Sequence, residues 1–192
     1  MTKEWGVTSR SSSGTFGRSF LVQAADEVNT VPEDKPIRIY YIGDLDAGGL
    51  MIERAAREGN GKEGRAYREG LYQILQSRHG WSEEQIEDRI TWERLALTAD
   101  EFLTLPESVR VAAKSKDNNL AEYRAYWEAN GHPEFVQPGQ EVGAEVEALP
   151  LQELRDRVEE TIKDAIDWPS WRESEGHADA DESKLVEWVD QL

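Results

Sequence analysis

The sequence of 192 residues lacks cysteine entirely and has only three histidines, His79, His132 and His177. The chain therefore has no disulfide, no thiolate metal site and no cysteine nucleophile, and any metal would be held by oxygen ligands. No stretch approaches the roughly 20 apolar residues that span a bilayer, and the first residues have no apolar core like that of a signal peptide. We therefore expect an intracellular, cytoplasmic protein without a membrane segment.

Positive charge is also scarce. The 22 lysines and arginines stand against 39 aspartates and glutamates, which gives a formal net charge of -17. Such a chain repels a phosphate backbone unless basic residues gather locally, so the charge argues against tight, autonomous DNA binding. A solubilising surface, as in a salt-adapted host, and an acidic protein that docks on a basic partner both agree with this composition.

The length suits one main domain, which we expect over residues 1–168, followed by an acidic tail over residues 169–192. Residues 173–192 contain seven acidic residues and one lysine, a local net charge of -6. Apolar residues recur at helical spacing near the end of this tail, which predicts a short amphipathic helix that docks on the body or on a partner.

Secondary structure follows from apolar periodicity and from capping signals. The β-branched and aromatic segment 37–42 predicts an interior strand of a parallel sheet. A short strand that runs into a Ser/Gly loop is expected at 6–15, and a further strand at 91–97. The expected helices lie at 16–31, 50–58, 62–78, 120–131 and 150–166, with short capped helices after Ser82 and Thr98.

Asp44 and Asp46 follow the segment 37–42 directly and precede a helix, so we expect both carboxylates at the carboxyl edge of the sheet, where open α/β sheets bind ligands. Two carboxylates one residue apart between glycines suit Mg²⁺, whose remaining positions are filled by water and phosphate. The alternative is local: Asp44 caps the turn and Asp46 caps the helix that begins near Gly48.

Two other phosphate motifs fit this stretch less well. A dinucleotide fingerprint needs G-x-G-x-x-G, whereas the glycines here are Gly43, Gly48 and Gly49. A haloacid-dehalogenase-like phosphatase has Thr or Val two residues after its second aspartate, where this chain has Gly48, and no later adjacent acidic pair completes such a site.

The segment Gly43 to Leu50 resembles the glycine–aspartate–x–aspartate–x–x–glycine motif of Toprim domains, in the form found in topoisomerase VI and in small Toprim-like proteins of phages and prophages. Residues 6–25 resemble the glycine/serine loop and helix that precede this strand in the family, and residues 93–98 resemble its next strand. Residues 116–117 and 145–150 resemble later segments, so the resemblance spans residues 6–167.

The resemblance implies a Rossmann-like parallel sheet flanked by helices, whose acidic edge holds Mg²⁺ (or Mn²⁺) for phosphodiester cleavage, rejoining or nucleotidyl transfer. Toprim domains also place a general acid/base glutamate on an upstream strand, and that strand and its helix are not found before Gly6, where Glu4 is the only nearby acid. Glu147 and Asp117 are the candidates to replace this glutamate. Alternatively, Glu147 simply faces solvent, and Asp117 forms a loop ion pair with Lys116.

Two further residue types bear on the same motif. Arg10 and Arg18 flank the Ser/Gly loop and are candidate phosphate ligands, or else solvated surface arginines. Tyr40 and Tyr41 lie within the strand and are expected in the core. The family's nucleophilic tyrosine stands on a separate winged-helix domain, which has no counterpart in this sequence.

Two functions follow from these observations. The first is a Mg²⁺-dependent, Toprim-type nucleic-acid enzyme or module that is completed by a partner chain or by a missing N-terminal segment, and that binds nucleic acid weakly alone. The second is a non-catalytic acidic interaction module on a degenerate Toprim scaffold, which binds a basic protein.

Overall fold

A computed structural model of the chain describes residues 7–10, 16–60, 68–112, 120–136 and 141–173. The chain forms two compact units, one of Arg10–Leu151 and the other of Met1–Ser9 with Gln152–Leu192. All described candidate site residues, from Arg10 to Glu147, belong to the first unit.

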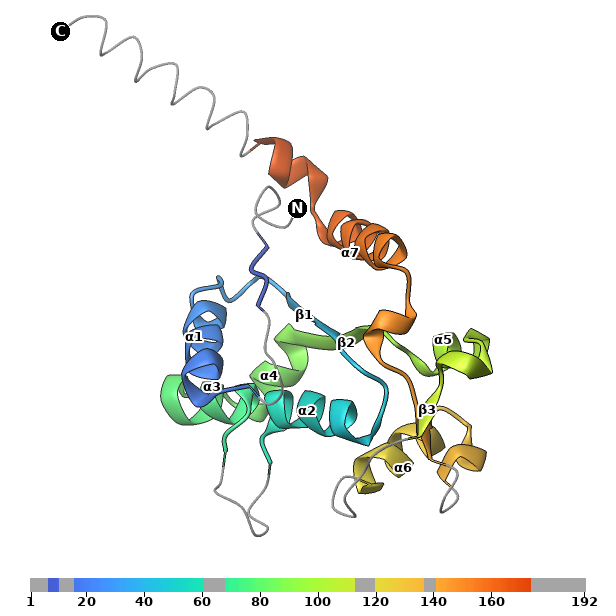
Figure 1. Cartoon of the computed structure of the whole chain (residues 1–192). Helices are drawn as coiled ribbons and strands as arrows, with labels where there is room; N and C mark the ends of the chain where they lie inside the picture. Colours follow the sequence, from blue (N-terminus) through green and yellow to red (C-terminus); the bar gives the residue numbers. More distant parts are fainter. Residues whose placement is uncertain (1–6, 11–15, 61–67, 113–119, 137–140, 174–192) are drawn as a thin grey trace, which may run out of the picture. The chain divides into compact units, whose positions relative to one another are not determined.

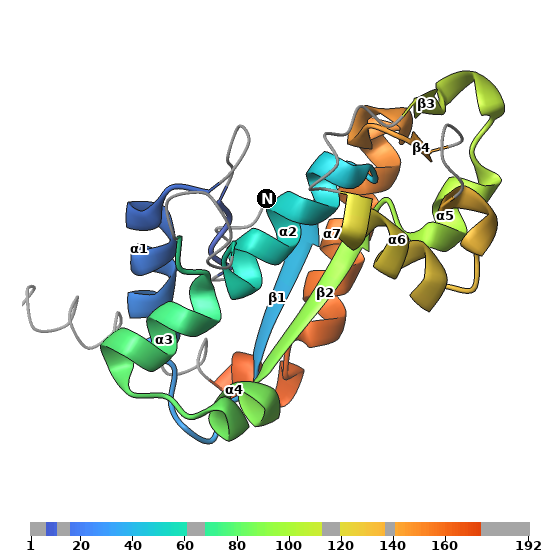
Figure 2. The same ribbon diagram turned by 90° about the horizontal axis from the view of Figure 1, so that it is seen from below.

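The first unit is mixed α/β, with helices predominating around a short parallel sheet. Strands β1 (Ile37–Ile42) and β2 (Ile90–Ala96) pair in parallel from Ile37 opposite Ile90 onward. Helices α1 (Arg18–Asn29), α2 (Ala47–Glu58), α3 (Leu71–His79) and α4 (Glu83–Arg89) accompany them. Helix α2 lies along the two strands, and α4 leads directly into β2 (Figure 1 and Figure 2).

One apolar cluster holds these helices and strands together. Burial of apolar surface contributes about 25 cal/mol per Å² to folding, which makes such a cluster the main stabilising element. Its buried members come from α1, β1, α2, α3, α4, the start of β2 and the turn before α4: Leu21, Ala25, Ile37, Ala56, Leu71, Ile74, Leu75, Trp81, Ile86 and Ile90.

A second group of elements follows β2. Among the described residues, it includes α5 (Ala99–Thr104), β3 (Val111–Ala112), α6 (Leu120–Ala129), β4 (Val142–Gly143) and short 3₁₀ helices at Glu107–Val109, Pro133–Val136 and Val146–Ala148. Strands β3 and β4 pair in antiparallel fashion. Trp127 is fully buried at the centre, with the rings of Phe102 and Phe135 at 5.2 and 4.6 Å.

The capping boxes predicted at Ser82 and Thr98 are confirmed. Ser82 and Thr98 each accept from the backbone N–H three residues on, and Gln85 and Glu101 return the contact, which completes both capping boxes. Helix α2 is followed by its C-cap Gly59, whose φ of 83° is one that residues with a side chain rarely adopt.

Several expectations differ from the structure. Residues 7–10 form no strand, although a strand was expected from residue 6. Among the described residues β1 pairs with β2 alone, so its expected interior position is not found there. The helix expected from Leu50 begins at Ala47, because Asp46 caps it. The helix expected from Lys62 begins at Leu71: residues 68–70 are not helical, and residues 61–67 lie outside the described residues.

Helix α7 (Leu151–Ala165) begins one residue after Pro150 and carries two i,i+4 ion pairs, Arg157–Glu153 at 3.0 Å and Lys163–Glu159 at 2.5 Å. Most of the expected acidic tail, with its amphipathic helix, lies outside the described residues, as do Glu4, Lys116 and Asp117. Within the described ranges, no helix is both long and apolar enough to cross a membrane.

Candidate metal site at the carboxyl ends of the strands

The segment after β1 is fixed by a backbone contact with a distant part of the chain. Leu45 donates to the carbonyl of Ala144 at 2.9 Å and accepts from the Ala144 N–H at 3.1 Å, in an isolated antiparallel bridge. Leu45 and Ala144 are fully buried. Because side chains alternate along an extended backbone, Asp44 and Asp46 project to the face opposite Leu45.

Asp46 is the N-cap of α2. Its backbone is extended, and its Oδ1 accepts from the Gly49 N–H at 2.6 Å, which satisfies one of the free donors at the helix start. This is the capping role that the sequence offered as the alternative to metal binding. The other carboxylate oxygen, Oδ2, accepts no hydrogen bond from the residues that the structure describes.

Asp44 is anchored in a similar way across a long sequence distance. Its Oδ1 accepts from the backbone N–H of Val146 at 2.9 Å, 102 residues away. Its Oδ2 likewise has no hydrogen-bond donor in the described part of the chain. Each aspartate is thus oriented through one oxygen by a backbone amide, and the second oxygen of each accepts no hydrogen bond from the described residues.

Glycine is required on the segment that faces the aspartates. A Cβ on Gly143 would lie 2.6 Å from the carbonyl oxygen of Leu45 and 2.7 Å from the Cβ of Asp46, closer than real Cβ contacts. A Cβ on Gly49 would lie 2.2 Å from the carbonyl oxygen of Asp44. Both glycines therefore permit a close backbone approach that a side chain would prevent.

Glu147 stands one residue beyond the amide that holds Asp44, but its side chain is exposed and has no hydrogen bond or ion pair with either aspartate. The antiparallel bridge instead sets Glu145 opposite Asp44. Among the described residues, no group of three or more histidines, cysteines or carboxylates gathers as a metal site. The described chain therefore offers a metal two carboxylates.

The buried side chain of Arg94 closes the same edge of the sheet. Its Nη1 donates to the carbonyls of Gly43 at 2.9 Å and Asp44 at 3.2 Å, which follow β1. The same nitrogen lies 3.4 and 3.3 Å from the carbonyls of Ala96 and Leu97, at the end of β2. One guanidinium group therefore joins the carboxyl ends of both strands beside the aspartates.

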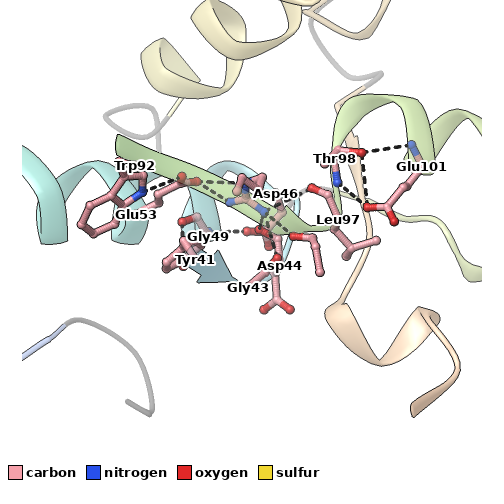
Figure 3. Close-up of polar contacts among 12 residues, drawn as sticks. Tyr41, Gly43, Asp44, Asp46, Gly49, Glu53, Trp92, Leu97, Thr98 and Glu101 are labelled. Carbon is pink, nitrogen blue, oxygen red and sulfur yellow. Dashed lines mark hydrogen bonds and ion pairs between the residues drawn. The ribbon is translucent and has the colours of Figure 1, made fainter. Parts of the chain in front are cut away.

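Glu53 of α2 balances the charge of Arg94. Arg94 Nε donates to Glu53 Oε2 at 2.9 Å, and Nη2 lies 2.7 Å from the same oxygen, at an angle that does not make a second hydrogen bond. The other oxygen of Glu53 accepts from Trp92 Nε1 at 3.2 Å. The side chains of Arg94 and Glu53 are only 7% and 13% exposed, so the pair is desolvated and each partner depends on the other. Figure 3 shows the hydrogen bond from Trp92 to Glu53 and that from Gly49 to Asp46, with Asp44 beside them.

Tyr41 packs beneath this pair. Its ring centroid lies 5.1 Å from the Arg94 guanidinium carbon, and its hydroxyl donates to the Gly49 carbonyl at 3.4 Å. Burial raises the pKa of Tyr41 to about 12, and the charges of Glu53, Asp44 and Asp46 add to the rise while Arg94 opposes it. The core position expected for Tyr41 is thus confirmed, whereas Tyr40, also expected in the core, is only half-buried.

The end of β2 is irregular where it meets the site. Tyr41 pairs with Arg94 but Ile42 pairs with Ala96, so Leu95 is an extra residue in β2. The fully buried Leu97 has a φ of 44°, a conformation that costs a bulky residue about 1–3 kcal/mol. The carbonyls of Ala96 and Leu97 turn toward Arg94 at this point.

The two candidate phosphate ligands are already paired with acids. Arg10 forms an ion pair with Glu27 and lies over the ring of Phe20 at 5.3 Å. Arg18 forms an ion pair with Glu69 at 3.0 Å, and its side chain is 73% exposed. Neither arginine contacts Asp44 or Asp46, so a role in phosphate binding stays a prediction.

Comparisons with known proteins give no match: no protein-family model, no curated protein and no solved structure is significantly similar to this chain. The residues themselves therefore carry the functional argument. Arg94 and Glu53 were missed in the sequence because each looks like an ordinary surface charge. The available signal was weak: Arg94 alternates with Trp92 and Ala96 along its strand, and Glu53 lies two helical turns after the N-cap of α2.

The first prediction separates the capping role of Asp46 from its charge. Asp46→Ala removes the acceptor of the Gly49 amide and should lower the free energy of unfolding by about 0.5–2 kcal/mol, whereas Asp46→Asn keeps an N-cap and should cost much less. Urea denaturation without divalent metal measures both. Equal destabilisation by the two variants would contradict the capping account.

Proposed function

We propose that this chain is a Mg²⁺-dependent, Toprim-type module for phosphodiester chemistry on nucleic acid, which acts inside the cell together with a protein partner. One observation carries the proposal. Asp44 and Asp46 follow the carboxyl end of a parallel strand, each oriented by a backbone amide through one oxygen and with the second oxygen available.

The available donors suit this metal. Mg²⁺ prefers oxygen ligands and is commonly held by one or two carboxylates, with water and substrate phosphate in its other positions. Asp44 and Asp46 would hold it, and their free Oδ2 atoms are the ligands that the chain supplies. When bound, such an ion supplies charge stabilisation for a phosphoryl group. Two carboxylates that share a site repel each other without a cation, so a cation bound by both would stabilise them.

The fold around the aspartates also supports the proposal. A parallel pair of strands with a helix that starts at the acidic edge agrees with the beginning of a Rossmann-like, Toprim-like sheet. The proposed chemistry also requires a general acid/base, which Toprim domains supply with a glutamate. Glu147 and Asp117 remain the proposed replacements, with Glu147 one residue from the amide that anchors Asp44.

The alternative function is an acidic module without catalysis that binds a basic protein. The net charge of -17 favours it, as do the ion pairs that engage Arg10 and Arg18. The two functions differ in what they require at Asp44 and Asp46: the enzyme needs these carboxylates for a metal, whereas the acidic module needs only its overall charge.

The second prediction is that Mn²⁺ or Mg²⁺ stabilises the chain through this site. Ligand that binds only the native state stabilises it by mass action, by about 2.7 kcal/mol at a hundredfold excess over the dissociation constant. The melting temperature should therefore rise with metal concentration in the wild type. Asp44→Asn and Asp46→Asn should each abolish the saturable part of the rise, and Asp46→Asn does so while keeping the helix cap.

Asp34→Asn is the matched control for this measurement. Asp34 is an exposed acid in the loop before β1, at the opposite end of the strand, and its removal changes the net charge by the same amount. It should leave the metal-dependent rise unchanged. An equal response in the wild type and in both site variants would reject the metal site.

The third prediction concerns DNA. We expect the isolated chain to bind DNA weakly or not at all at physiological salt, because its charge opposes the electrostatic attraction that supplies most non-specific affinity. Without an established proton-transfer group, a loss typically worth about 10²–10⁴ in rate, cleavage should be no more than trace. Gel shift and supercoiled-plasmid nicking in Mg²⁺ and Mn²⁺ measure both quantities.

Efficient plasmid nicking by the purified chain, abolished in Asp46→Asn, would contradict the third prediction. That result would show a catalytically complete site within these 192 residues. Glu147→Gln in the same assay would then test whether Glu147 is the proton-transfer group.

A further inference from the structure

We infer that Arg94, with Glu53 as its counter-ion, is the positioning residue of the two aspartates: it holds both carboxylates in a ligand-ready arrangement before any ligand binds. This inference rests on the proposed function, since it concerns the same site. It assigns a role to a buried ion pair that the sequence did not single out. It also explains why a desolvated arginine stands at the edge of a sheet that carries acids.

Arg94 acts on Asp44 through the backbone. Its Nη1 lies 2.9 Å from the carbonyl oxygen of Gly43 and 3.2 Å from that of Asp44 itself. Those carbonyls stand where β1 has left its ladder with β2, so they need another donor. The peptide groups on both sides of the Asp44 Cα atom are thereby held by one rigid guanidinium plane, which directs the Asp44 side chain toward the Val146 amide.

Arg94 acts on Asp46 through α2. Glu53 lies seven residues after the N-cap Asp46, two helical turns along, and therefore on the same side of the helix. The ion pair with Arg94 and the hydrogen bond from Trp92 fix this face of α2 against β2. The hydroxyl of Tyr41 adds a contact to Gly49 in the first turn of α2. The helix start that orients Asp46 is thus tied to the same guanidinium.

Lysine cannot reproduce this arrangement. An arginine presents five donors in a fixed fork, whereas an ammonium group is a point charge with three donors on a flexible stem. Arg94→Lys therefore keeps the charge and loses the simultaneous contacts to Glu53, to the end of β1 and to the end of β2. The variant separates geometry from charge.

Arg89 offers a matched control on the same sheet. Its Nη2 donates to the carbonyls of Val31 at 3.1 Å and Pro32 at 2.7 Å, in the loop before β1, and its guanidinium lies over the Trp81 ring at 4.6 Å. Arg89 immediately precedes β2. It therefore joins the amino ends of the strands much as Arg94 joins their carboxyl ends, without contact to the aspartates.

The experiment uses the full chain in two measurements, at a temperature where circular dichroism shows all variants to be folded. The first is amide hydrogen exchange by NMR without metal, read at Val146 and Gly49, whose N–H groups donate to Asp44 and Asp46. The second is Mn²⁺ affinity by electron paramagnetic resonance. In Arg94→Lys and Glu53→Gln both amides should exchange faster, and Mn²⁺ should bind roughly 10- to 100-fold more weakly. Arg89→Lys should change neither quantity at the site.

The outcomes separate this inference from the proposed function. Unchanged exchange at Val146 and Gly49 in Arg94→Lys would overturn the positioning role, and so would faster exchange with unchanged Mn²⁺ affinity. If Arg89→Lys changed amide exchange and Mn²⁺ affinity at the site as much as Arg94→Lys, Arg94 would only stabilise the fold in general. That result would also overturn the positioning role. If the wild type binds no Mn²⁺, the proposed function fails, and the exchange measurement alone decides whether Arg94 positions the aspartates.

Discussion

A buried guanidinium group at the carboxyl ends of two parallel strands is the interaction on which the arrangement of this site depends. Arg94 contacts the backbone carbonyls that follow β1, those that end β2, and the carboxylate of Glu53 on α2. A desolvated charge of this kind is tolerated only when it is paired and hydrogen-bonded. Removing either partner leaves an uncompensated charge in the interior, so the pair constrains β1, β2 and α2 together.

The neighbouring features follow from that constraint. Leu97 adopts a positive φ at the point where β2 turns its carbonyls toward Arg94, and an extra residue in β2 breaks the ladder just before it. Gly143 lets the distant segment around Ala144 lie against Leu45 and Asp46. The strained Leu97, the bulge in β2 and the close backbone approach at Gly143 therefore all lie near the aspartates. Such features persist only where the surrounding structure holds them, and they concentrate at functional sites.

How far the sequence predicts this molecule depends on whether a feature is local. The strand 37–42 and the capping boxes at Ser82 and Thr98 are confirmed, because each depends on residues within a few positions. The position of the aspartates after that strand is also local.

The partners that orient the aspartates are not local: Glu53 and Arg94 are 41 residues apart, and Asp44 and Val146 are 102 apart. The sequence predicted that Glu147 would act beside the aspartates. In the structure, the contact from this segment to Asp44 is made by the backbone N–H of Val146. The strand expected near residue 6 is absent from residues 7–10, where hydroxyl and basic residues offer little apolar surface to bury.

The central claim is that the free oxygens of Asp44 and Asp46 bind one divalent cation. The most direct measurement is anomalous diffraction from crystals of the full chain grown with Mn²⁺ and collected at the manganese absorption edge. The account predicts an anomalous peak within coordination distance of both carboxylates, each still bound through its other oxygen to the amide of Val146 or Gly49. A map with no peak at these carboxylates, from crystals that contain Mn²⁺ bound elsewhere on the chain, would contradict it.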